Sequence, residues 1–307
     1  MIYTVTFNPA LDVTVFIDTF QFNGVVRVGR KISQAGGKGF NVSRALTILG
    51  SKNIAIGLLG GETGKKIEKE LISEGLEPLI FWIKGETRTN TVIRDKNGKY
   101  LKVNESGPTV SGEEWAAFLE QIGTIMKTGD IWVLSGSLPL GIPVGAYAVL
   151  CQHLKAKGCT VAMDTSGAAF RMGLNAVPDI VKPNQSEAWE LIGHKCSNEE
   201  IINTFLAQSI PLVCLSLGEK GIILSSDQEA IRVEPPKINE RNPVGAGDAA
   251  LAGLIYSMDR KEPLKLMAKW TVASGTAAAK SENNCFSSIK EVKNLLAQLK
   301  VENEAYR

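Results

Sequence analysis

The stretch that decides the fold runs from Ile131 to Asp164. It contains IWVLS at Ile131–Ser135, AYAVLCQHLKAK at Ala146–Lys157 and TVAMD at Thr160–Asp164. The two outer segments are short apolar runs of strand length, while the middle segment repeats its apolar residues at helical spacing. A strand, a helix and a second strand in this order predict two parallel strands joined by a crossover helix.

The same alternation of strand and helix patterns continues on both sides of this unit. Further buried strands are expected at Ile2–Phe7, Ile54–Leu58, Ile180–Lys182 and Leu212–Ser216, and further helices at Asn41–Leu49, Lys65–Glu74, Glu113–Met126 and Ser186–Ile192. Ser111-x-x-Glu114 and Ser288-x-x-Glu291 have the spacing of capping boxes at helix starts. We therefore expect an α/β fold with a mostly parallel sheet flanked by helices.

Two segments, 11–35 and 83–106, interrupt this alternation. Both read as short strands with no room for a crossover helix, and Asn97-Gly98 between Ile93 and Leu101 is a strong hairpin signal. We expect them to form a small β-sheet that stands off one α/β domain spanning residues 1–307. An antiparallel flap over a cleft, a plain β-appendage and a dimer contact are all compatible with this pattern.

Composition excludes several classes of protein. The 34 Lys and Arg residues nearly balance the 32 Asp and Glu residues, so no overall field would draw the chain to nucleic acid or to a membrane. Five cysteines without a C-x-x-C pair indicate reduced thiols, not a disulfide framework or a structural zinc site. The N-terminus reads as a strand and not as a signal peptide, and no apolar run approaches the about 18 residues of a spanning helix. We expect a cytoplasmic protein.

The strongest local signal is the loop Asn242-Pro243-Val244-Gly245-Ala246-Gly247-Asp248, which leads into a small-residue helical stretch. Glycines at a helix start leave backbone N–H groups open to an anion, and the helix dipole favours negative charge there. We expect Gly245, Ala246 and Gly247 to hold a transferring phosphate and Asp248 to accept a proton from a substrate hydroxyl. A plain glycine turn, with Asp248 as a partner of the helix dipole, is the alternative.

Two common nucleotide motifs do not fit the glycine-rich loops. Gly245-x-Gly247-x-x-Ala250 has the letters of the dinucleotide fingerprint, but it lies near the C-terminal end and not in the first βαβ unit. The cluster AGGKGFN at 35–41 and the segment at 60–66 both lack the spacing of a Walker A loop. A P-loop kinase is therefore not expected. His153 and His194 have no partner motif and are expected to have packing or surface roles.

Taken together, Gly36-Gly37-Lys38-Gly39-x-Asn41 and Val244-Gly245-Ala246-Gly247-Asp248 resemble the two signatures of the ribokinase-like PfkB carbohydrate kinases. The resemblance covers essentially the whole chain, through Asn8-Pro9-Ala10-x-Asp12, Thr87-Arg88-x-Asn90, Ser135-Gly136-Ser137-Leu138-Pro139, Lys182-Pro183-Asn184-x-x-Glu187 and Ser216-Leu217-Gly218-x-x-Gly221. The pattern is similar to that of the phosphosugar branch, which includes 1-phosphofructokinase and tagatose-6-phosphate kinase. It implies a single ribokinase-like kinase domain with a β-sheet lid, which pairs into a homodimer through that lid.

The resemblance also implies a site for a phosphorylated sugar. Asp12 would hold sugar hydroxyls, and Lys38 and Arg88 would supply positive charge to the sugar phosphate. The other implied substrate contacts are Gly37, Asn41, Asn90, Ser137 and Arg27, the last of which would reach a neighbouring subunit. For Asp12 a turn residue after Pro9 is the alternative, and for Arg27 a solvated surface arginine.

ATP and Mg²⁺ are the implied co-substrate and cofactor. The implied nucleotide contacts are Lys182, Asn184, Ser216, Gly218 and Gly221. Glu187, Asn184 and Asp164 would orient the hydration shell of the metal through water. The alternatives are a first-turn helix acid for Glu187 and a helix cap for Asp164.

The implied reaction is phosphoryl transfer from ATP to a phosphorylated ketohexose, with fructose 1-phosphate giving fructose 1,6-bisphosphate. Tagatose 6-phosphate and fructose 6-phosphate are rival acceptors, and a non-catalytic phosphosugar-binding regulator is the alternative of another class. The chain departs from the family pattern at two positions: Asn242 stands where many members have Asp, and Val92 where 1-phosphofructokinases often have Lys. These departures leave open the acceptor, any monovalent-cation site, the effectors and the oligomeric state.

Overall fold

The strand–helix–strand unit predicted at Ile131–Asp164 is present in the computed structural model, which describes residues 1–282 and 284–304. It consists of β8 (Ile131–Ser135), α4 (Ala146–Ala156) and β9 (Thr160–Asp164). The two strands are parallel and in register over their whole length, from Ile131 opposite Thr160 to Ser135 opposite Asp164.

This unit lies at the centre of a ten-stranded sheet with the order β14-β13-β12-β11-β10-β9-β8-β1-β4-β5. The other strands are β1 (Ile2–Thr6), β4 (Asn53–Leu59), β5 (Pro78–Trp82), β10 (Ile180–Val181), β11 (Leu212–Ser216), β12 (Ile222–Ser225), β13 (Ala230–Val233) and β14 (Val301–Glu304). All pairs from β11 to β5 are parallel, whereas β12, β13 and β14 are antiparallel to their neighbours. The predicted core strands are confirmed, and the antiparallel edge was not predicted.

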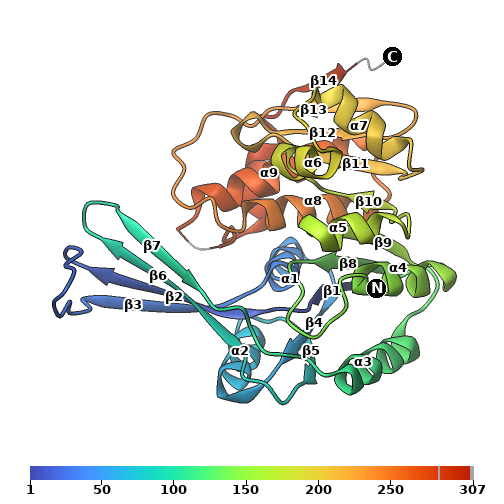
Figure 1. Ribbon diagram of the computed structural model, residues 1–307. Coiled ribbons are helices and arrows are strands. Elements are labelled where there is room, and N and C mark those ends of the chain that lie inside the picture. The colour runs from blue at the N-terminus through green and yellow to red at the C-terminus, as the bar shows by residue number, and fades with distance from the viewer. Residues whose placement is uncertain (283, 305–307) are drawn as a thin grey trace.

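Helices cover both faces of this sheet (Figure 1). One face carries α3 (Gly112–Ile125), α4, α5 (Gly167–Leu174), α6 (Gln185–Ile192) and α7 (Asn198–Leu206). The other carries α1 (Lys38–Leu49), α8 (Ala246–Asp259), α9 (Leu264–Lys280) and α10 (Ile289–Leu296). Along β1, Tyr3 and Val5 pack toward the first face and Ile2 toward the second, as the alternation of side chains in a strand requires. The predicted α/β class is confirmed.

A second sheet has the order β3-β2-β6-β7 and projects from the main body (Figure 1). Its strands are β2 (Ala10–Ile17), β3 (Arg30–Gly36), β6 (Arg88–Asp95) and β7 (Tyr100–Asn104), close to the predicted segments 11–35 and 83–106. The hairpin at Asn97-Gly98 joins β6 to β7, and Gly98 has a φ of 82°. Helix α2 (Gly61–Ser73) packs under the sheet, with Ile67 and Leu71 in the same buried cluster as Leu11 and Val13.

The expectation of an antiparallel flap is wrong at the centre of this sheet, because β2 and β6 are parallel. The chain passes through α1, β4, α2 and β5 between β3 and β6, so that β6 leaves the main body in the same direction as β2. That crossover is what parallel strands need. The function of the sheet as a lid stays a prediction.

One of the two predicted capping boxes forms in full. The backbone N–H of Glu114 donates to Ser111 Oγ at 3.1 Å, and that of Ser111 donates to Glu114 Oε2 at 2.7 Å. At the start of α10, Ser288 Oγ accepts from the Glu291 N–H at 3.4 Å, but the Glu291 carboxylate accepts from Ser287 instead. The second box is therefore only half right. Within 1–282 and 284–304, no helix is long and apolar enough to cross a bilayer.

Candidate active site

A cleft of about 540 Å³ opens where the parallel strands end. Its floor comes from the carboxyl ends of β1, β8, β9, β10 and β11, the place where open α/β sheets bind ligands. Most of the predicted site residues line it: Asp12, Gly37, Lys38, Asn41, Arg88, Ser137, Asp164, Lys182, Asn184, Glu187, Ser216, Gly245, Gly247 and Asp248. The fold thus brings residues from both ends of the sequence into one cavity.

The remaining predicted residues lie beside or away from the lining. Asn90 lies behind it and donates from Nδ2 to Asp12 Oδ1 at 2.9 Å, and Ala246 lies between the two glycines that line the cleft. Gly218 and Gly221 flank the 3₁₀ turn Gly218–Lys220 that follows β11. Arg27 is exposed in the connection between β2 and β3. Contacts of these residues with a ligand stay predictions.

The glycine loop forms the start of α8, with Gly245 as its N-cap. Gly245 has a φ of 80°, and a Cβ built on it would lie 2.3 Å from the carbonyl oxygen of Asn284, so only glycine fits. The first helical bond runs from the Ala249 N–H to the Gly245 carbonyl, and the amides of Gly247 and Asp248 precede it. Such first-turn amides have no partner within their own helix and can hold an anion.

Asn242 braces this loop from outside. Its Oδ1 accepts from the Val244 N–H, and its Nδ2 donates to Asn284 Oδ1, both at 3.1 Å. The Ala246 N–H donates to the Pro243 carbonyl at 3.3 Å. The amides of Gly245, Gly247 and Asp248 make no hydrogen bond within the described residues, and their contact with a phosphate stays a prediction.

The carboxylate of Asp248 is held by a buried network that the sequence did not indicate. Asn41 Nδ2 donates to Asp248 Oδ2 at 2.8 Å. Arg44 Nη1 in turn donates to Asn41 Oδ1 at 2.8 Å, which fixes the amide with its nitrogen toward the carboxylate. Arg44 is only 6% exposed and is paired with Glu74 at 2.7 Å. Its other amino group donates to the Ala35 carbonyl of β3 at 3.1 Å.

Four charged groups lie together at the end of the cleft beside the glycine loop, namely Asp164, Lys38, Lys182 and Asp248. Asp164 is bracketed by Lys38 and Lys182, with both Nζ atoms 3.2 Å from its carboxylate oxygens. Burial opposes ionisation of Asp164, but the two lysines outweigh it and lower its pKa. Burial likewise opposes the charge of Lys182, but Asp164 outweighs it and raises the pKa of Lys182. Both groups are therefore charged at neutral pH.

For Asp248, the effects that raise the pKa outweigh those that lower it. Burial and the nearby negative charge of Asp164 raise its pKa to about 6, against the lowering effects of Asn41, Lys38 and Lys182. A carboxylate with such a pKa is ionised at neutral pH and still accepts a proton readily. This is the property that general-base catalysis requires.

The other end of the cleft carries Asp12 and Arg88. Burial raises the pKa of Asp12, against the lowering effects of Asn90 and Arg88. A Cβ on Gly36 would lie 2.0 Å from Asp12 Oδ2, so the bare glycine makes room for the carboxylate. Arg88 donates to the carbonyls of Asn8, Pro9 and Glu105. These bonds use three of its five N–H groups and leave two for a ligand.

Helix α6 begins at the cleft with a capping box that the sequence analysis did not identify. The Glu187 N–H donates to Asn184 Oδ1, and the Asn184 N–H donates to Glu187 Oε2, both at 2.9 Å. Glu187 is thus a first-turn acid of α6, as one of the two interpretations expected, and its contact with a metal stays a prediction. The cap uses Oε2 and leaves Oε1 of Glu187 for a ligand or a water.

Further lining residues were not predicted: Thr6, Asn8, Gly136, Ser166 and Val244. Asn8 had a signal, since it opens the Asn-Pro-Ala-x-Asp motif. Among the residues that the structure describes, Asn8 Oδ1 and Asn90 Oδ1 are buried acceptors without a hydrogen-bond partner. Buried acceptors normally have partners, so these two oxygens are exceptions; Asn8 belongs to the cleft lining and Asn90 does not.

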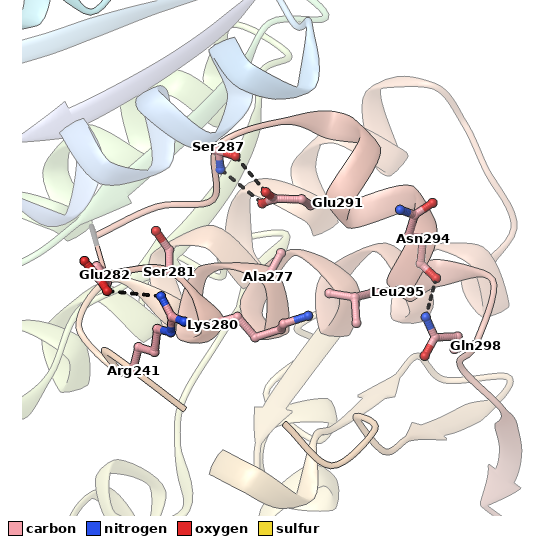
Figure 2. Close-up of a pocket in the computed structure, with 10 residues that line it drawn as sticks. All are labelled: Arg241, Ala277, Lys280, Ser281, Glu282, Ser287, Glu291, Asn294, Leu295 and Gln298. Atoms are coloured by element: carbon pink, nitrogen blue, oxygen red, sulfur yellow. Dashed lines mark hydrogen bonds and ion pairs between the residues drawn. The ribbon is translucent and has the colours of Figure 1, made fainter. Parts of the chain in front are cut away.

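A second hollow, of about 580 Å³, lies between α9 and α10 (Figure 2). Two pairs of its polar groups bind each other: Arg241 pairs with Glu282 at 3.0 Å, and Glu291 accepts from the Ser287 hydroxyl at 2.7 Å. Its lining contains none of the predicted site residues. The chemistry indicated by the sequence therefore belongs to the first cleft.

The chain is similar to known proteins along most of its length. The model of the pfkB family of carbohydrate kinases matches residues 7–291. The 1-phosphofructokinase of Bacillus subtilis (strain 168) is 34% identical over 305 residues, which cover 98% of this chain and 99% of the relative. A tagatose-6-phosphate kinase of Staphylococcus epidermidis is 34% identical over 276 residues, covering 86% and 89%.

A solved structure shares the whole fold. The phosphofructokinase-2 of Escherichia coli in complex with fructose-6-phosphate superposes with a TM-score of 0.88 at 27% identity, covering 97% of this chain and 98% of that one. The predictions of a sugar kinase and of its family are confirmed. The chain belongs to the pfkB family of carbohydrate kinases, phosphotransferases with a sugar acceptor.

Proposed function

We propose that the protein transfers the γ-phosphoryl group of ATP to the 6-hydroxyl of fructose 1-phosphate, giving fructose 1,6-bisphosphate and ADP. One observation carries the proposal: Asp248 and Lys38, from opposite ends of the sequence, line a single cleft. A base and a fixed positive charge are the two groups that phosphorylation of a phosphosugar requires. The 34% identity to a 1-phosphofructokinase over 98% of the chain supports the choice of acceptor.

In the proposed reaction the 6-hydroxyl oxygen attacks the γ-phosphorus while the bond from this phosphorus to the ADP oxygen breaks. Asp248 takes the hydroxyl proton, and the first-turn amides of Gly247 and Asp248 hold the transferring group. Lys38 lies in the same cleft, where its ammonium would counter the charge of phosphate groups. Positioning and charge neutralisation provide most of the catalysis in such reactions.

The sugar end of the cleft suits hydroxyl donors. Asp12 lines the cleft, and its carboxylate accepts one hydrogen bond from Asn90 behind it, which leaves further acceptor positions for sugar hydroxyls. The two unused N–H groups of Arg88 would bind the phosphate that the sugar already carries.

ATP and Mg²⁺ would occupy the side of the cleft formed by β9, β10 and α6. The donor set fits magnesium, because Asp164, Asn184 and Glu187 all offer hard oxygen atoms to one cavity. When bound, Mg²⁺ would neutralise charge on the phosphates of ATP. Since both oxygens of Asp164 face lysines, we assign the contact through water mainly to Glu187 Oε1 and Asn184. Lys182 and Ser216 would contact the nucleotide, with Gly218 and Gly221 shaping the turn next to it.

Tagatose 6-phosphate is the second candidate acceptor, because a tagatose-6-phosphate kinase has the same 34% identity as the 1-phosphofructokinase. Fructose 6-phosphate is the third, from the complex of the similar E. coli phosphofructokinase-2. A non-catalytic phosphosugar-binding regulator is disfavoured, because such a protein needs no carboxylate of raised pKa beside an anion cradle.

We further propose a homodimer formed through the small sheet. Several apolar side chains of this sheet and its connections are exposed: Phe22, Val25, Val28, Ile32, Leu101 and Val103. Exposed apolar side chains gathered in this way are typical of an interface. In such a dimer Arg27 would approach the partner's cleft. The cytoplasmic location stays a prediction.

A coupled assay of ADP release tests the proposal. Purified protein with Mg²⁺-ATP would be given fructose 1-phosphate, tagatose 6-phosphate, fructose 6-phosphate and free fructose in turn. We expect the highest kcat/KM for fructose 1-phosphate, and a loss of about 10²–10⁴-fold in kcat for Asp248→Asn. Turnover of none of the four would overturn the kinase assignment. Preference for another acceptor would overturn only the choice of substrate, and full activity of the variant only the role of Asp248.

A further inference from the structure

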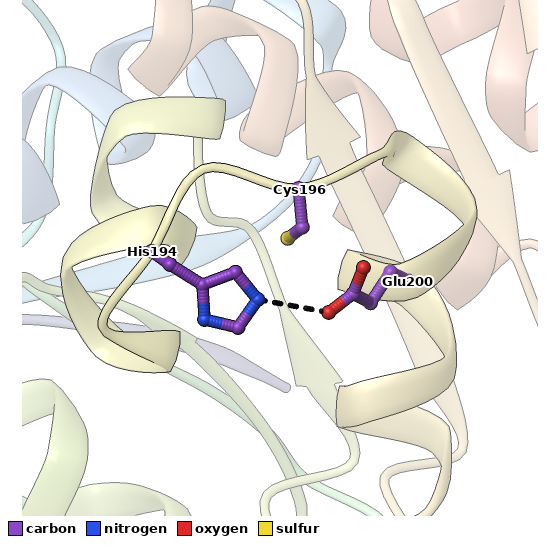
Figure 3. Close-up of side chains that lie close together, drawn as sticks. All are labelled: His194, Cys196 and Glu200. Carbon is purple, nitrogen blue, oxygen red and sulfur yellow. Dashed lines mark hydrogen bonds and ion pairs between the residues drawn. The ribbon is translucent and has the colours of Figure 1, made fainter.

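His194, Cys196 and Glu200 converge on one point outside the active-site cleft, where the link that follows α6 enters the first turn of α7 (Figure 3). Each offers one ligand atom, and the three atoms lie within 4.8 Å of one another. His194 Nε2 already lies 3.0 Å from Glu200 Oε1. We propose that these three side chains form a Zn²⁺ site, completed by one water molecule.

The chemistry of the three donors favours zinc. A thiolate, an imidazole and a carboxylate are the ligand types that Zn²⁺ combines, whereas Mg²⁺ selects oxygen donors. In a tetrahedral zinc site with ordinary bond lengths the ligand atoms are about 3.3–3.6 Å apart. The three ligand atoms lie within 4.8 Å of one another, so adjustment of the side chains on ion binding would bring them to that spacing. The sequence analysis expected no structural zinc site, because the cysteines form no C-x-x-C pair and H-x-C-x-x-x-E is not a common zinc motif.

Hydrogen bonds hold the backbone of the link in place. Trp189 Nε1 donates to the Cys196 carbonyl at 3.0 Å, and the Glu200 N–H donates to Ser197 Oγ at 3.1 Å. Gln185 Nε2 donates to Asn198 Oδ1 at 2.8 Å and so connects α6 to α7. A site on such a backbone is preorganised, and this reduces the ordering that metal binding must impose.

The site is open to solvent and independent of the kinase chemistry. The side chains of His194 and Glu200 are 61% and 52% exposed, so an ion can reach them. Cys196 is only partly buried, whereas the other four cysteines of the chain are buried. The nearest cation on the link, Lys195, lies over the Trp189 ring at 5.7 Å from its centroid.

The test is a titration of reduced, full-length protein with Zn²⁺ against a chromophoric chelator, with excess Mg²⁺ to occupy the oxygen-rich sites. We expect one Zn²⁺ per chain. His194→Ala, Cys196→Ser and Glu200→Gln should each weaken binding at least about tenfold, as loss of a metal ligand does. His153→Ala is the matched control, since His153 is exposed in α4 and is the other of the two histidines. It should bind Zn²⁺ as the wild type does.

A second readout follows the thiol and needs no enzyme activity. Cys196 should react with an aromatic disulfide reagent in the apo protein, become protected by Zn²⁺ and become reactive again when EDTA is added. Equal affinity in His194→Ala and wild type, or bound Zn²⁺ that leaves Cys196 reactive, would refute the site. Melting temperatures of the apo variants show whether they are folded, because all four substitutions lie at the surface or in a link.

Discussion

Asn41 Nδ2 donates to Asp248 Oδ2 at 2.8 Å because Arg44, one helical turn further along α1, holds the amide oxygen. An asparagine amide can rotate by half a turn and then present oxygen in place of nitrogen. The guanidinium of Arg44 prevents this rotation, since it can only donate. Arg44 is therefore a positioning residue for the proposed base.

Replacing Arg44 with Met should weaken this control. The amide of Asn41 would lose its partner, and a rotated amide oxygen would repel the Asp248 carboxylate. Loss of one hydrogen bond to a charged group should move the acid limb of kcat/KM to higher pH by about one unit. The other charged groups near Asp248, namely Asp164, Lys38 and Lys182, keep their places. Burial raises the pKa of the neighbouring Cys285 thiol to about 12, so that it stays neutral.

The pH profile of kcat/KM is the measurement, with Arg171→Met as the control for loss of an exposed arginine. Glu74→Gln, which keeps Arg44 and removes its ion pair, should shift the limb in the same direction by less. A uniform loss of rate at every pH, with no shift, would assign Arg44 a purely structural role.

The wild-type protein should itself lose activity in acid. Burial and Asp164 raise the pKa of Asp248 to about 6, so the fraction of ionised base decreases about tenfold per pH unit below that value. The acid limb of kcat/KM should therefore have its midpoint near pH 6, and the residual activity of Asp248→Asn should lack this limb. A midpoint near pH 4 would contradict the environment that we describe for Asp248.

Asp248→Asn should also make the protein more stable at pH 8. The folded pKa of about 6 lies above the usual value of an aspartate, so ionisation of the buried side chain lowers the free energy of unfolding increasingly from about pH 4, and in full above the folded pKa. The cost is absent below about pH 4, where the carboxyl is protonated in both states. Thermal or urea unfolding should show a gain of about 1–3 kcal/mol at pH 8 and little gain at pH 4. Equal gains at both pH values would show that charge is not the cause.

Gly36→Ala tests the sugar end of the cleft. The new Cβ would meet the Asp12 carboxylate and displace it, so KM for the phosphosugar should rise about tenfold or more while KM for ATP stays within about twofold. Gly112→Ala is the matched control, because a Cβ there has no neighbour within 4 Å. If both Michaelis constants rise together, Gly36 shapes the whole fold and not the sugar site alone.

Leu101→Glu tests the proposed dimer. This side chain of β7 is 50% exposed in the single chain, and a carboxylate in its place should disfavour burial against a partner subunit. Sedimentation velocity should show a dimer for the wild type and a shift toward monomer for the variant. Leu140→Glu, on a residue 56% exposed and outside the small sheet, is the control and should not change the sedimentation. A wild-type monomer would refute the proposed interface.

Much of this architecture could be read from the sequence, because its signals are local. The strands Ile131–Ser135 and Thr160–Asp164 have apolar runs with clear ends, and the structure has both with the same bounds. The Asn97-Gly98 turn likewise carries its own conformational requirement. The direction of β6 relative to β2 depended on the intervening crossover and not on either strand, so the local pattern could not give it.

In the candidate site, too, some residues could be predicted from local sequence signals and others could not. The loop around Gly245 was predictable, because a glycine-rich helix start has a direct physical use. Arg44 was not, because in sequence it is an ordinary residue of an amphipathic helix, and its role arises only when Asn41, Ala35 and Glu74 surround it. The half-formed box at Ser288 shows the converse, since the right spacing did not ensure the second hydrogen bond.

The bond from Arg44 to the carbonyl of Ala35 has a mechanical consequence. Ala35 belongs to β3, so the small sheet and the proposed base share one anchor. A sheet that swings outward far enough to break this bond would loosen the same guanidinium that steadies Asn41. The proposed base would then keep its orientation only while the small sheet holds the position that it has in this structure.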